Sequence, residues 1–168
     1  NPSIAVTEKA ASREKLIKAI KQHRSGSNQV ALEDAVTTPL ELVKMVINTS
    51  DTSEITNSTR ITGLELLESV VGDPLNDFSD SVIFGSLTGV NGILNARPES
   101  SQSNSVDDAA ESKKVEDILL KLGLGLNADS VSGEVARNFT SDSIVLTVKK
   151  AASADDLAGE FGDAGNVK

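Results

Sequence analysis

The segment that most constrains the fold is a short stretch near the end of the chain in which apolar residues fall at every second position. Over residues 144–149 the apolar side chains Ile144, Leu146 and Val148 alternate with their neighbours, a pattern typical of a half-buried β-strand. A single strand cannot pair its own N–H and C=O groups, and even a two-stranded hairpin is marginally stable in water. We therefore expect this strand to join a sheet that lies largely outside the chain.

The rest of the sequence has the apolar spacing of helices rather than strands. Apolar residues three and four positions apart occur over residues 8–24, 38–47, 60–71, 81–96 and 105–122. The prediction is a mainly α protein, a helical bundle of about five helices followed by one β-strand. Along the chain it divides into a basic N-terminal helix and turn at 1–36, a helical bundle core at 37–127, a loop and β-strand at 128–150, and an irregular tail at 151–168.

Capping residues predict where these helices begin and end. Thr38 followed by Pro39 is a strong start signal, because threonine can cap the first turn and proline fits within it. Asp80 is expected to cap the helix over 81–96. Glycine is expected to end the third and fifth helices, at Gly72, Gly123 and Gly125.

The helix over 81–96 has small residues on the side opposite its apolar stripe. These small residues are Gly85, Gly89, Gly92 and Ala96. Each glycine in a helix costs about 1 kcal/mol relative to alanine, so we expect compensation from the close approach of a neighbouring helix. Gly85 and Gly89 match a membrane-dimer motif, but the apolar run is too short and too polar for a bilayer. A tight crossing in a soluble bundle is favoured over an interaction face.

Composition excludes several kinds of site. Without Cys the chain has no disulfide and no thiolate metal centre. Four Phe with no Trp or Tyr leave a core of Leu, Ile, Val and Ala, and little surface for stacking on bases. The net charge of −9 argues against non-specific nucleic-acid binding. No apolar run approaches the roughly 18 residues of a membrane span.

The charge is distributed unevenly. Residues 1–24 carry a net charge of +4, so the remainder carries −13. The basic first helix is predicted to present a solvated polar face, with an acidic partner or a membrane surface as the alternative. The chain begins at Asn1 and stops at Lys168 without a terminating element, so we expect a segment of a larger protein, in which absent targeting signals mean little.

No arrangement of residues predicts catalysis or a bound cofactor. His23 is the only histidine, and at the tail of a basic helix it is expected to cap that helix or face solvent. Asp73, Asp77 and Asp80 could ligate Ca²⁺, but they lack EF-hand spacing and fit turn and cap roles better. A second acidic group fits a helix N-terminus better than paired catalytic carboxylates: Asp107, Asp108 and Glu111. We therefore predict no catalytic, cofactor or metal site, and no enzymatic activity.

Three segments match the acceptor motif for N-linked glycosylation, at Asn48, Asn57 and Asn138. Because Ser and Thr are frequent here, about two matches would arise by chance, so the number alone proves little. All three fall in predicted loops or loop edges, where a glycan could stand in water. Glycosylation is the prediction, and ordinary Asn in turns is the alternative.

The order of the elements resembles a known extracellular domain. Helices rich in Leu, Val and Ser are followed by Ile118-Leu-Leu-Lys-Leu-Gly123 and then by the strand segment over 138–150. This resembles the helical first half of the GAIN domain, the autoproteolysis-inducing domain of adhesion receptors, and the matching region of polycystin-type and egg-jelly-receptor-type proteins. In that family the bundle ends in a segment like F-x-x-x-x-I-x-L-x-V-x-K, which enters a β-sandwich. The resemblance covers about Thr38 to Gly159, and the segments that look like the family's helices are 43–48, 64–71 and 90–95.

The resemblance implies a role without catalysis. The family's cleavage motif uses paired Cys, Trp and a His-Leu pair, whereas this chain lacks Cys and Trp and its His23 precedes Arg24, so no catalytic residue is carried over. The implied role is a non-catalytic structural and interaction module of a large receptor ectodomain, at the extracellular face of the plasma membrane. It would position the following β-sandwich, and its partners would be that sandwich and another surface protein, not nucleic acid. The alternative is a secreted or appendage-associated surface protein, such as a filament or adhesin subunit.

Overall fold

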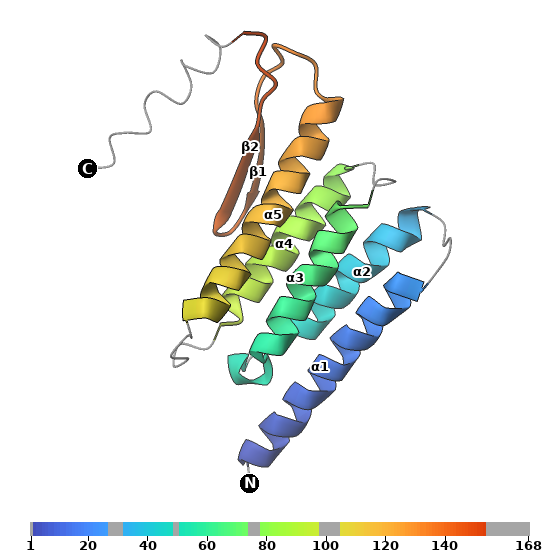
Figure 1. Ribbon diagram of the computed structural model, residues 1–168, viewed down its shortest axis with the longest axis vertical. Coiled ribbons are helices and arrows are strands. Elements are labelled where there is room, and N and C mark those ends of the chain that lie inside the picture. Colours follow the sequence, from blue (N-terminus) through green and yellow to red (C-terminus); the bar gives the residue numbers. More distant parts are fainter. Residues whose placement is uncertain (1, 27–31, 49–50, 74–77, 98–104, 154–168) are drawn as a thin grey trace, which may run out of the picture.

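The computed structural model describes residues 2–26, 32–48, 51–73, 78–97 and 105–153 (Figure 1). The helices are α1 Pro2–Gly26, α2 Leu32–Ile47, α3 Asn57–Val71, α4 Asp80–Asn95 and α5 Ser105–Asp129, with a short 3-10 helix η1 at Thr52–Glu54. Two strands follow, β1 Arg137–Ser141 and β2 Ile144–Val148. Consecutive α-helices run in opposite directions along the long axis of the molecule (Figure 1).

Helix α3 is the centre of the bundle, because it contacts each of the other four α-helices. Its residues Leu64, Leu66 and Leu67 have no exposed surface, although they point to different sides of the helix. A helix that is apolar on several sides needs several neighbours to cover it. The predicted mainly α fold, a helical bundle followed by a strand, is confirmed.

The predicted strand is present as β2, and its partner comes from within the chain. β1 pairs with β2 in an antiparallel two-stranded sheet. The sequence predicts only one strand within residues 128–150, so the presence of β1 is a difference from that prediction. The cause is that only Phe139 of β1 is buried, so its sequence carries too little apolar alternation to predict a strand.

The small residues of α4 allow neighbouring helices to approach closely, as predicted. A Cβ placed on Gly85 would lie 2.9 Å from Cδ1 of Leu40 in α2. A Cβ placed on Gly89 would lie 3.1 Å from both Cδ atoms of Leu67 in α3. Both distances are shorter than ordinary van der Waals contacts, so the tight crossing inside the bundle is confirmed.

Two predicted helix starts are wrong. Helix α2 begins at Leu32 instead of Thr38, so Pro39 lies inside the helix, where it removes one backbone hydrogen bond. The helix continues because burial of the following turns, at Val43 and Val46, outweighs that loss. Ser79 occupies the N-cap position of helix α4, without a capping hydrogen bond from its side chain, since Asp80 is already helical.

Helix α5 continues to Asp129, through both glycines that were expected to end it. The ring of Phe78 occupies the space that a side chain at Gly125 would need. This glycine therefore permits a packing contact and does not terminate the helix. Gly72 directly follows the last residue of α3, as predicted, while the predicted irregular tail lies outside the described residues from 154 onwards.

Candidate interaction surface

The hairpin is the place where the bundle meets a sheet (Figure 1). β1 packs on α4 and β2 packs on α5. One face of the hairpin joins the hydrophobic core through Phe139, Ile144 and Val148. The opposite face is exposed and consists of Asn138, Thr140, Val145 and Thr147. The hairpin thus covers the bundle with one face and offers the other face to its surroundings.

Aromatic and charged contacts hold the start of β1 on one side of α4. Nη2 of Arg137 donates to Oδ1 of Asp80 at 3.1 Å. The rings of Phe84 and Phe139 meet edge to face, with centroids 5.7 Å apart. The guanidinium carbon of Arg137 lies 5.2 Å from the centroid of Phe139, within cation–π range. Asp80, predicted as a helix cap, is therefore an anchor for the hairpin.

The turn of the hairpin has a second anchor on α4. Nδ2 of the almost fully buried Asn91 donates to Oδ2 of Asp142 at 2.9 Å. The backbone of Asp142 has a positive φ of 31°, a left-handed conformation that Asp tolerates better than most residues. Sequence reasoning missed this anchor, although Ser-Asp-Ser before an apolar strand is a recognisable turn signal.

The basic first helix is not simply a solvated face, which corrects the prediction for it. Glu54 in η1 is almost fully buried and accepts hydrogen bonds from Nζ of Lys9 at 2.9 Å and from Nη2 of Arg13 at 3.0 Å. Nη1 of Arg13 also donates to the carbonyl of Val46 at 2.6 Å. Lys9 and Arg13 of α1 therefore stabilise the packing of α1 against η1 and α2.

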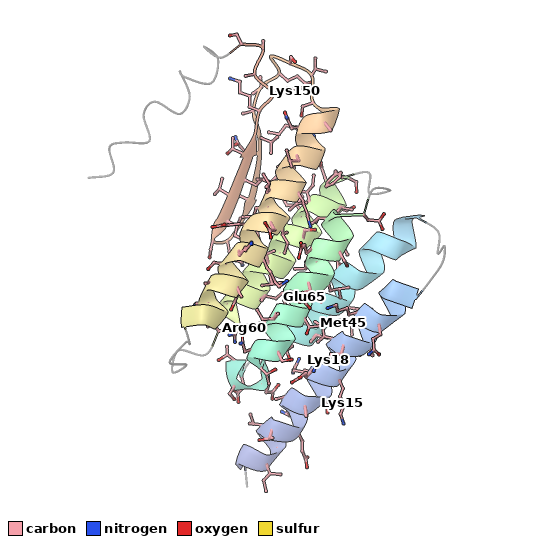
Figure 2. All side chains as sticks on the ribbon, in the orientation of Figure 1. Lys15, Lys18, Met45, Arg60, Glu65 and Lys150 are labelled. Carbon is pink, nitrogen blue, oxygen red and sulfur yellow. The ribbon has the colours of Figure 1, made fainter. Side chains whose placement is uncertain are left out.

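A second charge cluster joins α1, α3 and α5 around Glu65, which is labelled in Figure 2. Nζ of Lys21 donates to Oε2 of Glu65 at 2.6 Å, and Nζ of Lys114 lies 3.5 Å from Oε1. The hydrogen bond from Lys21 is the main cause that lowers the pKa of Glu65 below its ordinary value. A hydrogen bond from Lys18 likewise lowers the pKa of Glu14. Glu14 also accepts a hydrogen bond from Oγ of Ser58 in α3 at 2.9 Å, so both carboxylates join α1 to α3 while they are ionised.

Replacing Glu65 should weaken the bundle in a pH-dependent way. Since the folded-state pKa of Glu65 is lowered, its contribution is present above the unfolded pKa and is lost as the pH falls through the folded pKa. We expect Glu65→Gln to lower the free energy of unfolding by about 1 kcal/mol near pH 7, and the difference to shrink below about pH 4. Urea titrations at several pH values measure this.

The matched control is Glu41→Gln, which breaks an exposed pair with Lys44 inside α2. It should cost less than about 0.5 kcal/mol. A loss for Glu65→Gln that is the same at pH 3 and pH 7 would contradict the role given to its ionised carboxylate.

Two further charged residues are almost fully buried, Arg60 and Glu111, which are 6% and 4% exposed. Nε of Arg60 lies 3.5 Å from Oε2 of Glu111, too far for a good hydrogen bond. Within the described residues neither carboxylate oxygen of Glu111 has a hydrogen-bond partner. Figure 2 labels Arg60 near one end of the bundle. The expected place of Glu111 at a helix N-terminus is wrong, because it faces the core from the second turn of α5.

The three predicted glycosylation positions differ in their surroundings. Asn48 is exposed directly after α2, and Asn138 is exposed on β1, where its Oδ1 accepts from Oγ1 of Thr147 at 2.8 Å. Asn57 is the half-buried first residue of α3, and its Oδ1 accepts from Nη2 of Arg60 at 3.3 Å. Asn48 follows α2 and Asn57 lies at the edge where α3 begins, as expected, whereas Asn138 lies within β1 instead of at a loop. Asn48 and Asn138 have the room that a glycan needs.

The remaining candidate residues form no centre. The described residues contain no group of three His, Cys, Asp or Glu able to hold a metal ion. Asp108 pairs with Arg97. Asp77 and the side chains of His23 and Asp107 lie outside the described part of the structure.

A groove of about 520 Å³ lies between the C-terminal ends of α2 and α4. Its lining includes Ile47, Gly92 and the exposed Met45, which is labelled in Figure 2. Its two charged lining residues, Glu41 and Lys44, pair with each other at 2.8 Å. The lining therefore combines apolar surface with polar side chains and one internal ion pair.

None of the helices in the described part of the chain is both long and apolar enough to cross a lipid bilayer. Comparison with protein-family models, with curated proteins and with solved structures gave no match. The features that bear on function are therefore the hairpin, the bundle and the exposed acceptor positions.

Proposed function

We propose that the chain is a non-catalytic structural and interaction module of a large cell-surface receptor ectodomain, in which it positions a following β-sandwich. The observation that carries this proposal is the hairpin, a two-stranded sheet that is anchored on a helical bundle. A two-stranded sheet is normally stabilised by further strands or by packing on helices. Here one face packs on helices, and within the described residues each strand has only one partner strand.

The anchors of the hairpin support a positioning role. Two polar contacts, Arg137 with Asp80 and Asn91 with Asp142, join the strand and the turn to α4. Between them Phe139 and Phe84 pack edge to face. A sheet that grows from this hairpin would be fixed in orientation relative to the bundle, as a module that transmits force or a ligand signal requires.

An extracellular location is supported by the two exposed acceptor positions, Asn48 and Asn138. Both side chains stand at the surface, where an attached glycan would not displace the core. Residues 25–168 carry a net charge of −13, which is compatible with a cell-surface module and unfavourable for nucleic-acid binding.

The coding sequence that follows Lys168 tests the proposal. We expect about 100 residues with the alternating pattern of a β-sandwich, and then a span of about 20 apolar residues. Glycopeptide mapping of the protein from its native source should find glycan at Asn48 or Asn138. Tandem copies of the bundle without a following sandwich or span would sink the receptor proposal in favour of a filament or adhesin subunit.

A further inference from the structure

The two strands of the hairpin present different edges. The sheet order is β1-β2, so within the described residues each strand has one edge without a partner strand. Natural proteins protect such edges with charges, prolines or bulges. β1 has Arg137 and the acceptor Asn138, whereas β2, from Ile144 to Val148, has no charge, no proline and no glycine. The edge of β2 is therefore the unprotected one.

The turn geometry indicates which backbone groups this edge offers. Only Asp142 and Ser143 separate the paired residues Ser141 and Ile144, so a hydrogen-bonded pair closes the turn. In an antiparallel ladder hydrogen-bonded and non-hydrogen-bonded pairs alternate, so every second residue directs its N–H and C=O outward. On β2 these residues are Val145 and Thr147. Their side chains are exposed, and Val145 is 67% accessible.

Charges flank this uncharged edge with opposite signs. Asp142 precedes β2, and Lys150 follows it at the far end of the hairpin, where Figure 2 labels it. A strand that pairs in the antiparallel direction would meet Lys150 with its N-terminal end and Asp142 with its C-terminal end. Opposite charges in facing positions favour pairing and like charges oppose it.

We propose that the free edge of β2 accepts an extended strand from a partner polypeptide segment, in antiparallel orientation. The partner strand is apolar at alternate positions and uncharged in its middle, with an acidic N-terminal end and a basic C-terminal end. Main-chain hydrogen bonds to Val145 and Thr147 supply the affinity, and the end charges set direction and register. This inference deepens the proposed function and rests on it, since the following sandwich would supply such a strand.

A synthetic peptide with the sequence of residues 142–150, blocked at both termini, is the probe. Paired antiparallel about Leu146, its aspartate faces Lys150 of the protein and its last lysine faces Asp142. We expect peptide titration to shift the backbone amide signals of β2 in nuclear magnetic resonance spectra. Hydrogen exchange should slow most at the amides of Val145 and Thr147. A peptide with the same composition in scrambled order should cause neither change.

Two proline variants separate the edges. Thr147→Pro removes an outward N–H of β2, and Asn138→Pro removes the one in the register partner on β1. Both variants also remove the hydrogen bond between the side chains of Thr147 and Asn138, so a difference between them cannot come from that bond. We expect Thr147→Pro to weaken peptide binding about tenfold, and Asn138→Pro by less than about twofold. If Thr147→Pro unfolds the hairpin, Val145→Lys replaces it as the β2 variant, and Thr140→Lys, at the register partner on β1, replaces Asn138→Pro as the control.

The proposal is overturned if about 1 mM peptide leaves the β2 amides unchanged. It is also overturned if the shifts map to β1 or if both matched variants lose binding equally. If the peptide does not bind β2 but a β-sandwich is encoded after Lys168, the proposed receptor role stands and the strand-accepting edge is rejected. The sandwich would then contact the bundle elsewhere. If the peptide binds β2 but no β-sandwich is encoded after Lys168, the strand-accepting edge is supported and the proposed receptor role is rejected.

Discussion

Glu111→Leu is expected to destabilise the protein by about 3–5 kcal/mol, because it leaves the guanidinium of Arg60 buried without its opposite charge. Arg60 is 6% exposed, and its Nη2 also donates a 3.3 Å hydrogen bond to Oδ1 of Asn57. The total stability of a domain of this size is about 5–15 kcal/mol, so the loss is a large part of it. Urea unfolding followed by circular dichroism measures the change.

The double variant Arg60→Met with Glu111→Leu should recover most of that stability. Apolar residues of similar volume often replace a buried ion pair at little cost, especially where the pair has poor hydrogen-bond geometry, as its 3.5 Å separation indicates. Glu116→Leu, an exposed position on the same helix, is the control and should change stability by less than about 0.5 kcal/mol. A double variant no more stable than Glu111→Leu alone would show that the pair contributes through more than charge compensation.

Gly89→Val should destabilise the bundle by about 3 kcal/mol through overpacking between α4 and α3. Even a Cβ at this position would lie 3.1 Å from both Cδ atoms of Leu67, which has no exposed surface and little room to move. The two further methyl groups of valine need space that the crossing does not have. The midpoint of thermal unfolding should fall by several degrees for such a loss.

Gly123 is the matched control, because a Cβ there would meet no described atom within 4 Å. Gly123→Ala should stabilise α5 by up to about 1 kcal/mol, since alanine has the higher helix propensity. Effects of opposite sign at these two helical glycines would separate packing from propensity. Equal destabilisation at both positions would contradict the close crossing at Gly89.

The helices could be predicted from sequence because their apolar spacing is strong, and the glycine stripe of α4 correctly indicated a close crossing. Boundaries were less predictable. Gly125 resembles a terminator, yet it makes room for Phe78, and Pro39 lies inside α2 because later turns are buried. Local signals cannot report such contacts between distant segments.

The candidate surface was harder to predict for a related reason. β1 and the turn after it depend on contacts with Asp80, Phe84 and Asn91, which lie more than 50 residues earlier and leave no periodic pattern in the strand itself. The buried carboxylates Glu54 and Glu111 were likewise invisible to pattern reasoning, because their burial depends on charges from α1 and α3. Apolar periodicity therefore predicts the helices, whereas β1 and the buried carboxylates depend on contacts between distant segments.

The position of the hairpin on α4 and α5 has a consequence for synthesis on the ribosome. Proteins emerge from the N-terminus, and helices that contact their sequence neighbours can assemble early. The apolar surface that receives Phe139, Ile144 and Val148 stays uncovered until the last part of the described chain has emerged. We therefore expect an aggregation-prone nascent bundle with exposed apolar surface, to which chaperones could bind until the hairpin docks.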